Sequence, residues 1–161
     1  MSRLKDMRGF TLVELMITIV LLSIIIAIAI PNFTQFIRNN QVQAKADELK
    51  TFIQYARGQA VATRSSYQVA TGTVWTAGPA GGSADRRLEF NTTQAQAVTD
   101  PADLTLVFSS SGAASSAATA TVCRDGDSAN GFLLEVRPSG VIKMYARGYK
   151  SDTAKLTSCA P

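Results

Sequence analysis

The chain has 161 residues, a net charge of +4, two cysteines and no histidine. Without histidine the commonest general base in enzymes is missing, and neither cysteine has an imidazole partner, which argues against catalysis. The length suffices for one small domain behind an N-terminal segment. We therefore expect a structural or binding protein that is not an enzyme and that holds no cofactor and no metal.

An apolar stretch from Phe10 to Ile30 dominates the N-terminal part of the chain. A helix of roughly 20 such residues crosses a bilayer. The stretch contains one charge, Glu14, which costs about 2.5–3.5 kcal/mol near the centre of a span and less near its end. Three bases precede it, Arg3, Lys5 and Arg8. Because positive residues stay on the cytoplasmic side, the sequence predicts a single pass through the inner membrane, with the rest of the chain in the periplasm.

The segment from Gly9 to Glu14, Gly-Phe-Thr-Leu-Val-Glu, resembles the processing site of type IV pilins and of the pseudopilins of type II secretion. The resemblance implies that residues 1–9 are a leader and that prepilin peptidase, a membrane aspartate enzyme, cleaves between Gly9 and Phe10. The new amine of Phe10 would then be methylated, and Glu14 would pair with the terminal amine of a neighbouring subunit. A carboxylate in a dry helix bundle is tolerable only when it is paired.

Two other interpretations of the N-terminal segment stay open. The basic leader and the apolar run also suit a secretory signal peptide with Ala27-Ile28-Ala29 as its cleavage site, although that class carries no acid at the head of its apolar region. An uncleaved membrane anchor is the second alternative. It does not explain why the apolar stretch contains the charge of Glu14. The mass of the mature protein separates the three interpretations.

The helix is predicted to continue past Pro31 to residue 62, because no further proline occurs and apolar residues recur at three-to-four spacing. The predicted buried face consists of Val42, Ala46, Leu49, Phe52, Ile53, Ala56 and Ala60. The predicted solvated face carries Gln43, Lys45, Asp47, Glu48, Lys50 and Arg57. Pro31 is expected to kink or loosen the helix.

The predicted helix, residues 10–62, would be about 80 Å long. Such a helix cannot be buried in a domain of about 100 residues. Residues 10–30 must therefore find partners in lipid or in other copies of the same element, whereas residues 31–62 form an amphipathic part. This predicts a filament subunit, with a monomeric domain on a helical stalk as the alternative.

Residues 63–161 show the period of two that predicts short antiparallel strands, which would pack over the apolar face of the helix. The expected strands are 67–70, 73–75, 87–91, 104–108, 119–123, 132–136 and 141–145. Residues 92–103 are polar and are expected to form a connection that ends in the Asp100-Pro101 turn.

Two cysteines, Cys123 and Cys159, fall in the part predicted to be exported. In an oxidising compartment they are expected to form a disulfide, with two buried free thiols as the alternative. The bond would close a loop of about 35 residues and contribute roughly 3–4 kcal/mol in the chain-entropy model.

Four short patterns resemble the head of small minor pilins of the FimU and FimT kind, and of the related H-type pseudopilin of type II secretion. They are Tyr55-Ala56-Arg57, Leu106–Phe108 followed by Gly112, Val122-Cys123, and Val136 to Val141. The resemblance implies an α+β type IV pilin fold, with a long N-terminal helix, membrane-spanning in its first half, on a small antiparallel β head.

The same resemblance implies a subunit at or near the pilus tip that helps to start assembly and ends at the cell surface. Its partners would be other minor pilins, the major pilin, prepilin peptidase and the inner membrane. A type II secretion pseudopilin shares this architecture and is the first alternative.

DNA capture is the second alternative, because Lys143, Arg147 and Lys150 are candidate phosphate contacts near the C-terminus. A solvated strand face explains them equally well. DNA-receptor pilins of the FimT kind carry Gly-Arg-x-Arg after the last turn, whereas this chain has Gly-Val-Ile-Lys at 140–143. Lysine cannot fork onto phosphate as arginine does, so the departure favours a structural role.

Two loops lack the residues of a binding site. Residues 78–83 are glycine-rich but lack the Lys-Ser/Thr ending of a phosphate loop. Residues 125–131 resemble a calcium loop, yet Ala129 stands at the fifth position and the glycine at the seventh, so an ordinary turn is predicted.

Overall fold

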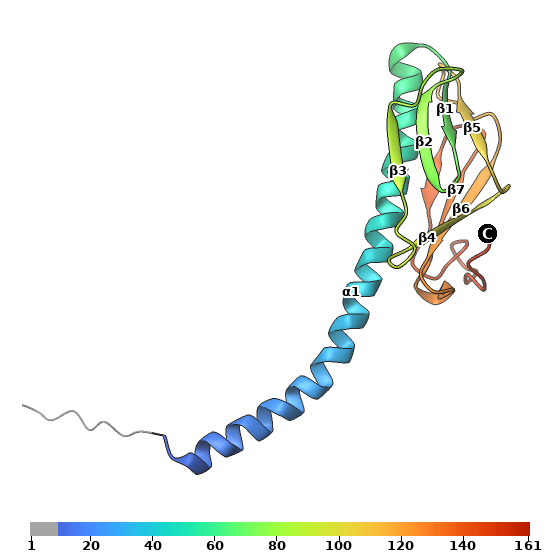
Figure 1. The fold of residues 1–161 in the computed structure, drawn as a ribbon. Helices are drawn as coiled ribbons and strands as arrows, with labels where there is room; N and C mark the ends of the chain where they lie inside the picture. The colour runs from blue at the N-terminus through green and yellow to red at the C-terminus, as the bar shows by residue number, and fades with distance from the viewer. Residues whose placement is uncertain (1–9) are drawn as a thin grey trace, which may run out of the picture. The chain divides into compact units, whose positions relative to one another are not determined.

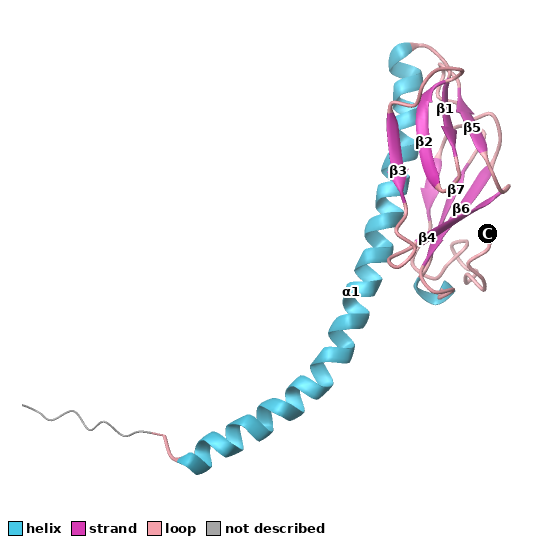
Figure 2. Cartoon of the chain, viewed as in Figure 1, coloured by secondary structure: helices cyan, strands magenta, loops and turns pink. Residues whose placement is uncertain are grey.

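The structure is a computed structural model that describes residues 10–161. It divides into two compact units after Ile37, which are described separately below. One helix, α1 (Leu12–Thr63), contributes residues to both units (Figures 1 and 2). The expected leader and Gly9 lie outside the described residues.

The first unit consists of the apolar part of α1, whose side chains are exposed. Pro31 lies inside the helix and does not end it. Because proline lacks a backbone N–H, a carbonyl one turn earlier loses its donor. Neighbouring side chains donate to other carbonyls of this region: Asn32 Nδ2 to Ile28 O at 3.0 Å and Thr34 Oγ1 to Ile30 O at 2.8 Å. Within the described part of the chain, α1 is the one helix long and apolar enough to cross a membrane.

The second unit begins at Arg38 and holds the core. Every residue of the predicted apolar face is buried in it: Val42, Ala46, Leu49, Phe52, Ile53, Ala56 and Ala60. The predicted solvated face is only partly correct: Gln43, Asp47 and Glu48 are exposed, whereas Lys45, Lys50 and Arg57 are half-buried. Arg57 donates to the Gly112 carbonyl at 3.0 Å.

Two antiparallel four-stranded sheets pack with this part of α1 (Figure 1). The first has the order β3 (Arg86–Glu89), β2 (Val74–Pro79), β1 (Tyr67–Ala70) and β5 (Thr105–Phe108). The second has the order β4 (Gln96–Asp100), β6 (Ala118–Cys123), β7 (Phe132–Val136) and β8 (Ile142–Met144). A short 3₁₀ helix, η1 (Ser128–Asn130), precedes β7.

The expectation that residues 92–103 form only a connection was wrong, because β4 lies there. It pairs with β6 from Gln96 opposite Cys123 to Asp100 opposite Thr119. Its residues are Gln, Ala, Val, Thr and Asp, of which only Val and Thr favour strands. The strand is therefore specified by its partner β6 and not by its own composition.

Alternate side chains of β6 belong to two different clusters of buried residues. Ala118, Ala120 and Val122 join the main core, in which Phe52, Phe108 and Leu106 are almost fully buried. Cys123 belongs instead to a small cluster with Leu133 and Leu156 from the C-terminal segment. All buried residues of the described chain lie between Val42 and Leu156, so the second unit holds a complete core.

Candidate assembly site and head surfaces

Thr11 and Glu14 form a capping box at the start of α1. The Thr11 backbone N–H and its Oγ1 hydroxyl both donate to Glu14 Oε2 at 2.9 Å, and the Glu14 N–H donates to Thr11 Oγ1 at 3.2 Å. Such a box satisfies free donors of the first helical turn. Glu14 Oε1 accepts no hydrogen bond within residues 10–161, so it remains available to another donor.

This capping role was not predicted from the sequence, although Thr-x-x-Glu before an apolar run is the usual signature of a capping box. Phe10 precedes the box and is exposed. The apolar side chains of α1 between Leu12 and Ile30 are also exposed. A contiguous apolar surface of this size requires lipid or other helices as a partner.

Arg57, Gly112 and Gly140, which belong to the head patterns singled out in the sequence, meet in one place. Arg57 Nε donates to Gly112 O, and the Gly140 N–H closes its turn onto Arg137 O at 2.8 Å. Both glycines have positive φ, near 80°. A Cβ atom on Gly140 would lie 1.8 Å from Gly112 O, so the site is a tight backbone junction.

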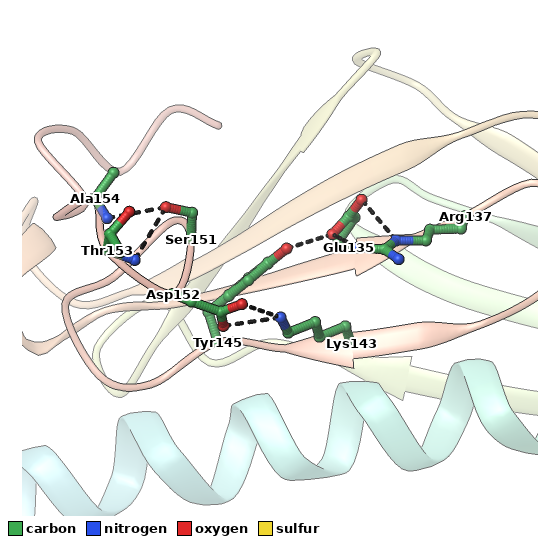
Figure 3. A network of polar contacts seen from close by, with 8 residues as sticks. All are labelled: Glu135, Arg137, Lys143, Tyr145, Ser151, Asp152, Thr153 and Ala154. Carbon is green, nitrogen blue, oxygen red and sulfur yellow. Dashed lines mark hydrogen bonds and ion pairs between the residues drawn. The ribbon is translucent and has the colours of Figure 1, made fainter.

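The basic residues near the C-terminus are largely paired with other groups (Figure 3). Lys143 donates to both oxygens of Asp152 at 2.8 and 2.9 Å, and Arg137 donates to Glu135. Arg147 donates to Gln43 on α1 at 2.9 Å and lies over the Phe132 ring. Lys150 and Lys155 remain exposed, without a side-chain partner among the described residues.

Glu135 also accepts from the Tyr145 hydroxyl at 2.5 Å. That hydrogen bond, followed by the one from Arg137, holds the pKa of the Glu135 carboxyl below its usual range. A carboxylate with a lowered pKa stabilises the fold above its unfolded-chain pKa of about 4.3. This contribution is lost as the pH falls through the lower pKa of the folded state.

Tyr145→Phe is therefore expected to lower the free energy of unfolding modestly at neutral pH, and this loss should shrink below about pH 4. Urea unfolding of residues 38–161 at both pH values measures the difference. Tyr149→Phe is the matched control, since the Tyr149 hydroxyl has no hydrogen bond in the described residues. A deficit that stays the same at both pH values would show that the Tyr145 hydroxyl does not act through the Glu135 carboxylate.

Cys123 and Cys159 form a disulfide in the structure, at a sequence separation of 36. The bond ties the C-terminal segment to β6. Gly131 lies against it, since a Cβ there would stand 2.5 Å from Cys123 Sγ. The C-terminal segment is thus held over the face of the second sheet that does not face the main core.

Cys159→Ser is expected to lower the melting temperature of residues 38–161 by about 10 °C or more, from a loss of about 3–4 kcal/mol. A reductant should bring the unmodified head to the same value and leave the variant unchanged. Calorimetry in both conditions is the measurement, and equal melting temperatures of oxidised and reduced head would contradict a stabilising role.

Residues 125–131 form a turn that leads into η1. Asp127 caps η1 by accepting from the N–H groups of Ala129 and Asn130. In the part of the chain that the structure describes, no three acidic, histidine or cysteine side chains converge as metal ligands would.

An apolar N-terminal helix with a capped glutamate, joined to a head of two antiparallel sheets, defines the class of membrane-anchored pilins and pseudopilins. Residues 4–30 match the model of the prokaryotic N-terminal methylation motif, and residues 45–140 match that of the type II transport protein GspH. The second match spans more than half of the chain. The protein belongs to the GspH family, a family of minor pilins and pseudopilins.

Two crystal structures of the minor pilin FimU from Pseudomonas aeruginosa PAO1 share the fold. One gives a TM-score of 0.64 at 23% identity, covering 77% of this chain and 98% of FimU. The other gives 0.59 at 25% identity, covering 73% and 98%. The predicted type IV pilin fold is therefore confirmed.

A further relative is the type IV major pilin PilA of Myxococcus xanthus DK1622, which is 52% identical over 44 residues. This segment is 27% of the present chain and spans only 18% of that pilin. Family membership implies membrane anchoring through the apolar N-terminal helix.

Proposed function

We propose that this minor pilin helps to start assembly of a type IV pilus and sits at or near its tip. The observation that carries the proposal is the likeness to FimU, which extends over 98% of the FimU chain. We assign it no catalytic role and no cofactor, in keeping with relatives that are structural pilins.

The proposed pathway begins with insertion, with the N-terminus in the cytoplasm and the head in the periplasm. Prepilin peptidase then releases Phe10, whose amine becomes methylated. The mature protein should therefore have the mass of residues 10–161, with one disulfide and one methyl group. A product that begins after Ala29 would instead indicate a secretory signal peptide, and an intact chain would indicate an anchor.

Assembly would transfer residues 12–30 from lipid to the helices of other pilins. In this step Glu14 Oε2 would still accept the two hydrogen bonds from Thr11, and Glu14 Oε1 would accept one from the ammonium group of a neighbouring subunit. The pair cancels two charges in an apolar bundle, where either charge alone would be costly. Pro31 lies just beyond this segment and would allow local adjustment of the helix during packing.

Deletion of the gene in a strain that also lacks the retraction motor tests the proposal. We expect the amount of pilin sheared from the surface to fall sharply and to return on complementation. Normal surface pili would overturn the proposed role in pilus assembly.

Two other functions can be tested, one of them in the same deletion strain. The GspH match supports a pseudopilin of type II secretion, for which protein secretion would fail while pili persist. DNA capture would have to rely mainly on Lys150 and Lys155, because Lys143 and Arg147 are engaged elsewhere. A gel shift with residues 32–161 should then show weak binding that disappears between low and moderate salt.

A further inference from the structure

The two sheets of the head have four outer strands, β3, β5, β4 and β8, and an outer strand normally needs protection from pairing with other chains. On β5, the Ser115 N–H donates to Val107 O at 2.8 Å and Ser115 Oγ accepts from the Val107 N–H at 3.1 Å. The following segment of the chain therefore covers this edge.

The next two edges lie against the core or against α1. On β3, Lys45 of α1 donates to Glu89 O at 3.3 Å, and the Arg86 guanidinium lies over the ring of Tyr55. On β8, Ile142 and Met144 are half-buried and pack against the main core. Both strands also carry basic side chains, Arg86 and Arg87 on β3 and Lys143 on β8, and charges on an outer strand discourage pairing with a further strand.

The β4 edge differs from the other three. Within residues 10–161, the backbone of Gln96–Asp100 pairs with β6 on one side and has no partner on the other. The strand contains no lysine and no proline to block a second partner. Val98 at its centre is 42% exposed.

An open pocket of about 240 Å³ adjoins this edge. It is lined by Ala97–Thr99 of β4, by Thr71-Gly72 in the turn between β1 and β2, and by Trp75, Ala102 and Asp103. The pocket is large enough for a side chain of an added strand. Backbone pairing along an edge together with a side-chain pocket is the usual arrangement for binding an extended peptide.

The negative charge around β4 indicates which kind of peptide segment could bind there. The chain between Arg87 and Arg124 contains Glu89, Asp100 and Asp103 but no lysine or arginine, although the whole chain has 16 such bases. Asp100 ends β4 and Asp103 lines the pocket. An extended segment with a basic residue would complement these acids.

We propose that the open edge of β4 receives an extended, basic segment from the head of a neighbouring pilin, which adds to the second sheet as a further strand. This docking surface rests on the proposed function, since it presumes a neighbouring pilin. It also adds a contact between heads to the contacts between helices.

The test places the photo-cross-linker benzoylphenylalanine at Val98 of the full-length chain in cells. Val141, which is 48% exposed, is the matched control position. We expect an adduct with another pilin at Val98, at least about fivefold above Val141, on a peptide that contains lysine or arginine. Asp100→Asn with Asp103→Asn should reduce its yield severalfold.

Equal yields at the two positions, or adducts only with lipid or with proteins other than pilins, would overturn the docking proposal. A second test uses Val98→Lys, which should lower pilus assembly but leave the melting temperature of residues 38–161 unchanged because Val98 is exposed. If deletion removes pili and Val98→Lys restores them fully, the docking proposal alone fails. If deletion leaves pili normal, the proposed function fails.

Discussion

Glu14→Gln is expected to reduce the amount of this protein in sheared pili by about tenfold or more. Glutamine can still close the capping box with Thr11, because its side-chain oxygen accepts the same hydrogen bonds. It carries no charge for the ammonium group of a neighbour. An unpaired buried charge costs about 3–5 kcal/mol, which is ample for a tenfold loss. The measurement is a quantitative immunoblot of the sheared and membrane fractions.

Glu14→Ala removes both the cap and the charge and should give a loss at least as large. Glu48→Gln is the matched control, since Glu48 lies on the surface of α1 and pairs with Lys45. It should assemble normally. If Glu14→Gln assembled like the unmodified chain while Glu14→Ala did not, Glu14 would act as a helix cap and not as an assembly charge.

The buried face of α1 could be predicted in full because helical period and hydrophobicity are local properties of the sequence. Val42 to Ala60 follow one stripe, and each predicted member is buried. The strands rich in valine, leucine and phenylalanine were predicted for the same reason. β4 was missed because its pairing with β6 lies 19 or more residues away along the chain and does not show in its composition.

Arg57 illustrates a second limit of predicting contacts from the sequence. Its charge predicts solvent, yet two glycines far along the chain leave room for its side chain against a carbonyl. The basic residues near the C-terminus follow the same logic. Their sequence cluster predicts a positive surface, but Asp152 and Gln43 engage Lys143 and Arg147 only once the chain is folded. The processing motif, by contrast, is contiguous and could be identified without a structure.

Gly140→Ala is expected to destabilise the head by about 3 kcal/mol or more. Gly140 has φ of 78°, which L-residues adopt at a cost of order 1–3 kcal/mol. The added Cβ would also lie 1.8 Å from Gly112 O and 2.8 Å from Arg57 Nε. To remove this clash, the backbone of the loop that carries Gly112 must move. Such overpacking typically costs a further ~1–3 kcal/mol.

Gly126→Ala separates the two contributions. Gly126 has φ of 74°, close to that of Gly140, but an added Cβ there meets nothing within 4 Å. Its loss should therefore be limited to the backbone cost, about 1 kcal/mol. Urea unfolding of residues 38–161 compares the two variants. If both variants lost the same free energy of unfolding, the loop that carries Gly112 would move at little cost. Arg57, Gly112 and Gly140 would then not form a rigid junction between α1 and the sheets.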